Sequence, residues 1–347
     1  MRFYTKQHKF YCGIDLHAKK MYLCILDETG EIRLHKNINT DRELFLKAIH
    51  PFREDVVVAV ECMFTWYWIA DLCNQEKIPF VLGHALYMKA IHGGKAKNDK
   101  IDSRKIAVLL RGGMVPKAYV YPKKMRSTRD LLRRRNHLKN KRAELFAHIQ
   151  NTRSRYNLPD TLGCIAKLQN REGVVERFND PSVQKMIATD LSVIKAYDPI
   201  IAKMERDITN SAKHHDPVSH ALLNTVPGIG KILSLVILYE IESINRFPRV
   251  QDFVSYSRLV KSTKESNGKK YGSSGKKIGN AHLKWAFSEA AVLFLKGNKP
   301  GKKYLDRLAR KHGKGKALSI LAHKLGRAVY LMLKNKKPFD QDKFLGL

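Results

Sequence analysis

Paired cysteines, long apolar segments and acidic residues are all scarce in this sequence. The five cysteines include no C-x-x-C pair. This excludes the usual zinc sites and a disulfide framework, and it predicts reduced, mostly buried thiols in a cytoplasmic protein. No apolar run approaches the roughly 20 residues that a membrane-spanning helix needs, and no signal-peptide pattern opens the chain. We therefore expect no membrane partner.

The shortage of acids leaves a large positive charge. The 347 residues include 65 Lys and Arg against 32 Asp and Glu, which gives a formal net charge of +33. Such an excess costs self-repulsion that a polyanionic partner relieves, so a nucleic acid is the expected partner. Hydrophobic residues make up 44% of the chain, which is enough for the cores of two or three domains.

The first 118 residues show the element order of an RNase H-like α/β domain. Three strands joined by tight turns open the segment. The fourth strand is a continuous, mostly β-branched apolar run, which is typical of a strand buried on both faces. Helices and one further strand then alternate to give the order βββαβαβα. The predicted strands cover residues 10–17, 21–27, 31–38, 55–60 and 79–83, and the predicted helices cover 41–51, 65–75 and 85–91.

Four acidic residues fall where the elements of such a domain converge. Asp15 lies in the first strand, which we expect to be central, and Glu61 closes the fourth strand. Asp99 and Asp102 are three residues apart at a predicted helix start, so their side chains share one helix face. Carboxylates that meet at strand ends suit a divalent cation. Basic residues that suit the phosphates of a nucleic acid surround the second pair: Lys97, Lys100 and Arg104 among others.

Each acid also has an ordinary structural explanation. Asp15 fits an acid of an edge strand that faces water, and Glu61 fits the end of a strand. Asp99 and Asp102 fit the first turn of an N-capped helix, where the helix dipole favours acids. The four acids together, in so basic a chain, favour the metal site.

Residues 119–215 are charge-dense, and their apolar spacing predicts two long helices. The heptad positions are Leu131, Leu138 and Leu145 in the first helix, which ends before residues 157–159, and Ile187, Ile194, Ile201 and Ile208 in the second. Pro199 predicts a kink or a break in the second helix. Helices of this kind pack against each other or against a second chain. We predict a coiled-coil arm that carries dimerisation and basic contacts, Arg134 included; a solvated charged helix is the alternative.

Residues 216–347 predict a mainly helical domain. The sequence V-P-G-I-G at 226–230, followed by Lys231, resembles a helix-hairpin-helix turn, in which glycines let the backbone approach a phosphate. An ordinary Gly-rich helix connection is the alternative. Residues 261–280 are rich in Gly, Ser and Lys, a composition that predicts a flexible basic linker. Further helices are expected over 282–295 and 317–333.

These blocks together resemble the DEDD-type transposases of the insertion-sequence one-ten family, whose N-terminal domain resembles the Holliday-junction resolvase RuvC. The resemblance spans nearly the whole chain, and the order of the blocks is more specific than any one of them. The matching pieces are Y-C-G-I-D-L-H, V-V-A-V-E, K-N-D-K-I-D-S-R-K-I-A, V-P-G-I-G with the following E-I, and the block from Ser266 to Asn280.

The resemblance implies a mechanism and a set of partners. Asp15, Glu61, Asp99 and Asp102 would bind Mg²⁺, with Mn²⁺ as a substitute, and Ser266 would attack a DNA phosphodiester to form a transient phosphoserine link. The acids and the serine would form a composite site in a homo-oligomer, either a dimer or a tetramer. The partners would be the DNA of the element ends and of the target, selected by a structured bridge RNA. The expected phosphate contacts come from Lys97, Lys100, Arg104, Arg134, Lys231, Lys269, Lys270, Lys276 and Lys277.

Two departures from the family pattern and two rival functions stay open. The family has Ser-Gly where this chain has Ser266-Asn267-Gly268, and its Gly-Leu before this loop is Arg258-Leu259 here. Other serines are near enough to be alternative nucleophiles: Ser262, Ser273 and Ser274. A hydrolytic RuvC-like junction nuclease would use the same acids with water, without a covalent adduct. A non-enzymatic basic nucleic-acid-binding protein would explain the charge but not the acids.

Overall fold

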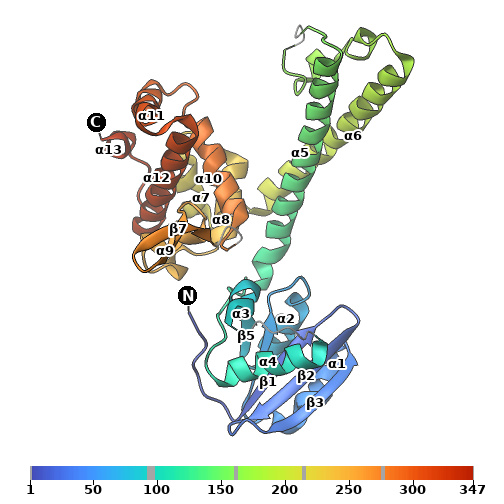
Figure 1. Cartoon of the computed structure of the whole chain (residues 1–347), viewed down its shortest axis with the longest axis vertical. Helices are drawn as coiled ribbons and strands as arrows, with labels where there is room; N and C mark the ends of the chain where they lie inside the picture. The colour runs from blue at the N-terminus through green and yellow to red at the C-terminus, as the bar shows by residue number, and fades with distance from the viewer. Residues whose placement is uncertain (1, 92–97, 160–162, 213–215, 275–277, 347) are drawn as a thin grey trace. The chain divides into compact units, whose positions relative to one another are not determined.

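The computed structural model describes residues 2–91, 98–159, 163–212, 216–274 and 278–346. The chain divides into two compact units, Met1–Lys124 and Met125–Leu347 (Figure 1). The first is a mixed α/β unit and the second is mainly helical. The division of the chain into three domains, 1–118, 119–215 and 216–347, stays a prediction.

The first unit is built on a five-stranded mixed sheet with the order β3-β2-β1-β4-β5. β1 pairs antiparallel with β2 and parallel with β4, so the first strand is central as expected. The bounds of all five strands agree with the predicted ranges to within a residue or two. The elements are β1 (Phe10–Leu16), β2 (Lys20–Asp27), β3 (Ile32–Asn39), α1 (Arg42–Ile49), β4 (Val56–Glu61), α2 (Tyr67–Gln75), β5 (Phe80–Gly83), α3 (Ala85–Ile91) and α4 (Asp99–Arg111).

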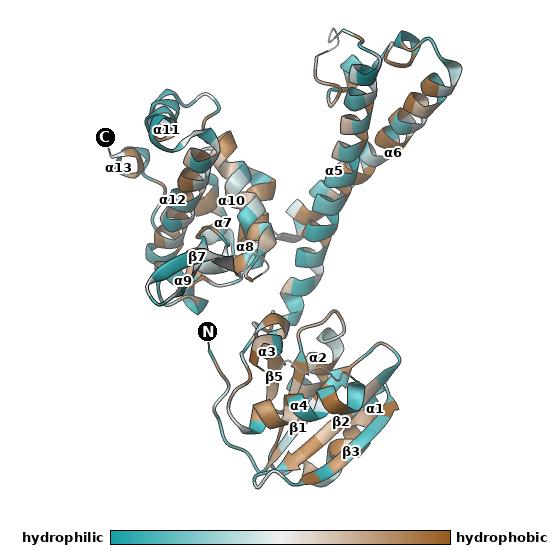
Figure 2. Cartoon of the chain, in the orientation of Figure 1, coloured by the Kyte–Doolittle hydropathy of each residue, from teal (hydrophilic) through white to brown (hydrophobic). Residues whose placement is uncertain are grey.

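The sheet separates two apolar layers because successive strand residues point to opposite faces. Even-numbered residues of β1 and β4, such as Ile14 and Val58, pack with α1 and α2. Odd-numbered residues, such as Tyr11 and Val57, pack with α4. β1 and β2 are pale to brown along much of their length in Figure 2, as expected for strands covered on both faces, whereas the edge strand β3 is mostly polar and exposed.

The second unit begins with two long antiparallel helices, α5 (Lys123–Arg155) and α6 (Pro181–Ala212). Ion pairs set their register: Arg135 with Glu205, Arg142 with Asp198, and His148 with Asp190. The four isoleucines of the predicted α6 heptad are at most 4% exposed. Pro199 does not break α6, which runs through that residue as one helix, and a kink there stays a prediction.

A helical bundle follows, with a β-hairpin inserted before its largest helices. Its core takes apolar side chains from α7, α8, α9, α10 and α12. The elements are α7 (Pro217–Asn224), α8 (Lys231–Ile241), α9 (Val250–Tyr256), β6 (Ser262–Ser266), β7 (Lys269–Ser274), α10 (Ala281–Leu293), α11 (Lys299–His312), α12 (Lys314–Asn335) and α13 (Gln341–Leu345). Short 3₁₀ helices lie at His50–Phe52, Leu168–Arg171, Val175–Arg177 and Ile244–Arg246.

Two glycines show how this bundle closes. Gly228, in the turn between α7 and α8, has φ +87°, and a Cβ there would lie 2.5 Å from the backbone nitrogen of Phe294. The turn therefore requires glycine both for its backbone conformation and for the close passage of the end of α10. Gly326 of α12 lies against the side chain of Leu259, with a Cβ position 2.4 Å from Leu259 Cδ1.

Candidate metal centre and nucleophile hairpin

Asp15 lies at the carboxyl end of the central strand, on the face that α4 covers. Tyr11, Gly13 and Asp15 alternate along β1, and Tyr11 packs in the layer between the sheet and α4. An acid at this position is half-buried between the sheet and the start of a helix. The alternative of an edge-strand acid is excluded because β1 has a neighbouring strand on each side.

Gly13 allows α4 to lie directly on β1. A Cβ at Gly13 would lie 2.3 Å from the backbone nitrogen of Ala107 and 2.5 Å from the carbonyl oxygen of Ser103. No larger side chain fits there without moving the helix. The absence of a side chain at this position thus lets the helix pack close to the strand that carries Asp15.

The first turn of α4 is fixed by two polar contacts. Asn98 is the N-cap, and its Oδ1 accepts a hydrogen bond of 2.8 Å from the Ile101 amide. His35 of β3 lies 3.0 Å from the carbonyl oxygen of Lys100 through its Nε2. The turn that holds Asp99 and Asp102 is therefore tied both to its own cap and to the sheet.

The two segments bring two carboxylates and an imidazole together. His17 Nε2 lies 3.4 Å from Asp15 Oδ2 and 3.6 Å from Asp99 Oδ1. One ligand atom from each of these three residues lies within 4.8 Å of the others. Asp102 is partly buried and contacts Lys105, with 3.5 Å between Oδ1 and Nζ.

The pKa of Asp15 is raised above its ordinary value, first by burial. The charge of His17 lowers it, whereas the negative charges of Asp99 and Asp102 raise it further. Two further acids thus act on Asp15 at this place, where a cation would relieve the repulsion. Hard oxygen donors at this spacing fit a divalent cation such as Mg²⁺, so the residues present suit the metal that a DEDD site implies.

Glu61 reaches the same edge of the sheet by strand register. The last parallel pair of β1 and β4 is Ile14 with Val60, and one residue further along lie Asp15 and Glu61. Neighbours in register on parallel strands face the same way, so both acids lie on the α4 side of the sheet. Glu61 is the last residue of β4, and its backbone pairs with Gly83 of β5.

Comparison with known proteins agrees with this geometry. Residues 12–157 match the family model of the DEDD transposases of IS110, and residues 220–306 match the family described as Transposase IS116/IS110/IS902. The two matches together cover most of the chain. The chain belongs to the IS110 family of DEDD transposases. No curated protein matches its sequence.

The family establishes a DNA transposase, an enzyme that acts on DNA. Its DEDD domain points to a divalent cation, and the group around Asp15 is the place in the described structure for one. Among the described helices, none is both long and apolar enough to cross a membrane.

His17 is the residue of this group that the sequence analysis left without a role. The signal was present, because only Leu16 separates Asp15 from His17, and residues two apart along an extended chain share a face. Histidine is not a preferred ligand of Mg²⁺, which is why a search for a magnesium site passes over it.

The segment of the transposase expected to be a flexible linker is in fact a β-hairpin. β6 and β7 pair antiparallel, with Ser262 opposite Ser274 and Ser266 opposite Lys269. The two residues between them, Asn267 and Gly268, both have positive φ, at 48° and 72°. Asn-Gly at a two-residue turn is a strong hairpin signal that the composition argument missed.

Ser266 therefore lies at the exposed tip of this hairpin. The extra Asn267 that separates this chain from the family's Ser-Gly pattern is one of the two turn residues. Backbone pairing places two of the alternative serines, Ser262 and Ser274, at the base of the hairpin instead.

The predicted phosphate contacts that the structure describes lie on the surface of the transposase. Lys100 and Arg104 are exposed on α4. The others are exposed on three different elements: Arg134 on α5, Lys231 at the start of α8, and Lys269 and Lys270 on β7. Lys97, Lys276 and Lys277 lie outside the described residues.

Proposed function

We propose that this transposase cleaves and rejoins DNA through Ser266, with the help of Mg²⁺ held by Asp15, Glu61, Asp99 and Asp102. The observation that carries the proposal is the meeting of Asp15 and Asp99 at the start of α4, with Asp102 close enough to affect the same carboxyl group. Mn²⁺ would replace Mg²⁺, because both prefer oxygen ligands.

The acidic residues and the bases around them have separate tasks. Asp15, Glu61, Asp99 and Asp102 supply oxygen ligands, and Lys105 holds the side chain of Asp102. Mg²⁺ bound there would polarise the scissile phosphate and stabilise charge on its oxygens. The exposed side chains of Lys100 and Arg104 attract the DNA backbone to this end of α4.

Ser266 supplies the nucleophile in this proposal. Its Oγ attacks phosphorus, one P–O ester bond of the DNA breaks, and the leaving sugar oxygen takes up a proton. The phosphoserine ester keeps the bond energy, so a hydroxyl of another strand can attack it and release the serine. Lys269 and Lys270 lie across the turn from Ser266 and can bind the phosphates on either side of the cleaved bond.

Each remaining part of the chain has a role in this proposal. The first unit would be RNase H-like, of the RuvC type, and α5 with α6 would be a coiled-coil arm that carries a homo-oligomer, a dimer or a tetramer. The turn between α7 and α8 would act as a helix-hairpin-helix, with Lys231 and the first amides of α8 at a phosphate. A structured bridge RNA would choose the two DNA partners.

The decisive test of the nucleophile is a covalent adduct on a denaturing gel. Wild-type protein, Mg²⁺ and a labelled DNA of the element ends should give a protein–DNA species. Ser266→Ala should remove this species, whereas Ser262→Ala should keep it. Cuts without any adduct would favour the hydrolytic nuclease, and persistence of the adduct in Ser266→Ala would move the nucleophile to another residue.

The metal site is tested with Asp102→Ala, which should abolish cleavage and leave DNA binding unchanged. Binding without any cleavage in the wild type, unaffected by EDTA, would favour the non-enzymatic binding protein. Mixing Asp102→Ala with Ser266→Ala should restore adduct formation if the acids and the serine act from different copies of the chain. Failure of the mixture, with both variants folded, would place them in one copy.

A further inference from the structure

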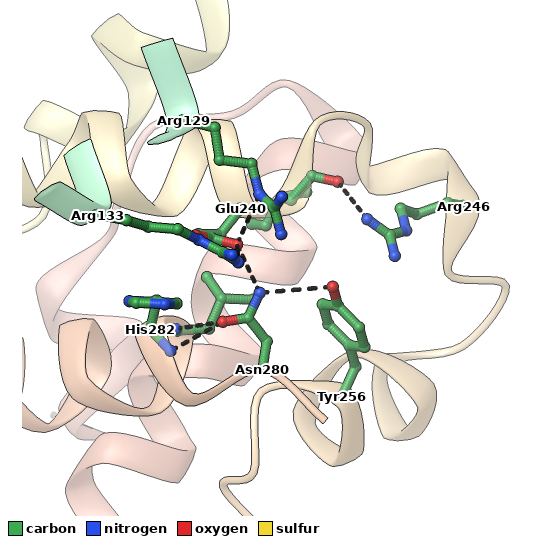
Figure 3. Close-up of polar contacts among 9 residues, drawn as sticks. Arg129, Arg133, Glu240, Arg246, Tyr256, Asn280 and His282 are labelled. Atoms are coloured by element: carbon green, nitrogen blue, oxygen red, sulfur yellow. Dashed lines mark hydrogen bonds and ion pairs between the residues drawn. The ribbon is translucent and has the colours of Figure 1, made fainter. Parts of the chain in front are cut away.

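A buried carboxylate links the long helix α5 to the base of the hairpin that carries Ser266. Glu240 of α8 is 2% exposed, and Figure 3 shows it between Arg129 and Arg133 of α5 and Asn280. Its Oε2 accepts hydrogen bonds from Arg129 Nε at 3.0 Å, Arg133 Nη2 at 3.0 Å and Asn280 Nδ2 at 2.7 Å. Its Oε1 accepts one from Arg133 Nε at 2.6 Å.

The α5 side of this link is specific in its geometry. Arg133 binds both carboxylate oxygens through two of its nitrogens, the bidentate arrangement that fixes orientation as well as distance. Arg129, one helical turn earlier, is itself 7% exposed and approaches the same carboxylate. The next residue after Arg133 is the exposed Arg134, so the contact to Glu240 and a predicted nucleic-acid contact share one turn of α5.

The hairpin side of the link is Asn280, where the chain leaves the hairpin. Its Oδ1 caps α10 by accepting from the His282 and Leu283 amides. The backbone amide of Asn280 donates a hydrogen bond of 2.6 Å to the carbonyl oxygen of Tyr256, a residue that lies before the hairpin. Asn280, which follows the hairpin in the chain, is therefore hydrogen-bonded to the residue Tyr256 before the hairpin and, through Nδ2, to Glu240.

The entry to the hairpin is held against the exit by a second set of contacts. Arg258 Nε donates to the carbonyl oxygens of Ile278 and Gly279, at 2.9 and 3.0 Å. Gly279 has φ +89°, and a Cβ there would lie 2.6 Å from the Tyr256 oxygen. The base is thus closed at the point where Glu240 reaches it.

We infer that Glu240 is a positioning residue, which fixes the base of the Ser266 hairpin to α5 so that the nucleophile and the nucleic-acid-binding helix keep one orientation. The inference rests on the proposed role of Ser266. Glu240 itself is buried and binds Asn280, Arg129 and Arg133, all from its own unit, so its role is to hold these residues rather than to take part in the chemistry.

The chain offers variants that break the link and keep the fold. Glu240→Gln removes the charge and keeps the shape. Asn280→Ser keeps an oxygen that can cap α10 but lacks the Nδ2 donor. The matched control is Glu205→Gln, which weakens another partly buried ion pair of α5, with Arg135, that lies outside the hairpin base.

The experiment measures single-turnover adduct formation at saturating DNA, together with the Kd for DNA. Both Glu240→Gln and Asn280→Ser should slow adduct formation by at least about tenfold, since small displacements of a reacting group have effects of that size. Their Kd should stay within about threefold of wild type, and the double variant should be no slower than the slower single variant. Glu205→Gln should react at the wild-type rate.

Wild-type rates in the folded link variants, or an equal loss in Glu205→Gln, would overturn the inference. If the wild type forms no adduct, the proposed role of Ser266 fails instead. Amide hydrogen exchange, which needs no substrate, then still tests the link. Exchange across 262–274 and at Asn280 should be faster in both link variants than in Glu205→Gln, and unchanged exchange would overturn the inference independently.

Discussion

Gly13 of β1 and Ala107 of α4 are in such close contact that a Cβ on the glycine would lie 2.3 Å from the alanine nitrogen. Ser103, one turn earlier in α4, passes the same glycine with its carbonyl oxygen. The helix can lie this low only because the strand has no side chain there. This contact sets the height of the first turn of α4 above Asp15.

Gly13→Ala should therefore cost both stability and activity. The added methyl group meets backbone atoms, which cannot rotate away, so we expect a loss of about 3 kcal/mol, the upper end for overpacking. Cleavage should fall further than binding, because Asp99 moves away from Asp15. Urea unfolding and an Mg²⁺-dependent cleavage assay measure the two effects. Gly315→Ala is the control, since its Cβ would meet nothing within 4 Å; equal behaviour of the two variants would contradict this role of Gly13.

His17→Ala should change which cation the site prefers. The imidazole lies between Asp15 and Asp99 at 3.4 and 3.6 Å, and imidazole suits transition metals better than Mg²⁺. We expect the affinity for Mn²⁺ to fall several-fold while that for Mg²⁺ changes little. Calorimetric titration of each ion into the apoprotein measures both. A parallel loss for the two ions would show that His17 acts on the acids alone.

The buried Glu240 should make stability fall in acid. Burial raises the pKa of Glu240. The hydrogen bond from Arg133 and the charges of Arg129 and Arg133 outweigh burial, and together they lower the pKa from an ordinary value of 4.5 to about 2. A lowered folded pKa means that the stabilisation is complete above about pH 5 and is lost as the pH falls towards 2. The shift corresponds to about 3 kcal/mol.

Urea unfolding of the wild type and of Glu240→Gln at pH 7 and pH 3 measures how much the ionised Glu240 contributes to the free energy of unfolding. The wild type should be more stable than the variant at pH 7, and the difference should shrink at pH 3. The other carboxylates of the chain titrate in both proteins and cancel in the comparison. A difference that stays constant over this range would mean that Glu240 keeps an ordinary pKa in the folded state.

Replacing Arg134 should affect DNA binding, whereas replacing Arg135 should affect stability, although the two residues are neighbours on α5. Arg134 is exposed, so Arg134→Ala should lower DNA affinity and reduce the slope of log K against log salt by about 1. Arg135 is 6% exposed and paired with Glu205, so Arg135→Ala should lower stability and leave the slope unchanged. Fluorescence anisotropy over a series of salt concentrations measures the slopes. An unchanged slope in Arg134→Ala would remove this residue from the interface.

The sequence by itself determined the local structure of the first unit and the general function. The short apolar run of β1 and the β-branched run of β4 determined the strands, because burial on a pleated sheet selects those side chains. The spacing of Asp99 and Asp102 determined a shared helix face, and the order of the sequence blocks indicated the family. The pair Asn267-Gly268 also indicated a hairpin turn, although the Gly-, Ser- and Lys-rich composition around it predicted a linker instead.

Only the tertiary structure decided which distant residues meet. The convergence of Asp15 with Asp99 depends on Gly13 and on strand order, neither of which shows in the spacing along the chain. The same holds for Glu240, which lies 107 residues from Arg133 and 40 residues from Asn280. Within an apolar helix such as α8, one glutamate has no visible partner in the sequence. Its partners follow from packing, because a buried carboxylate is stable only where the fold brings donors to it.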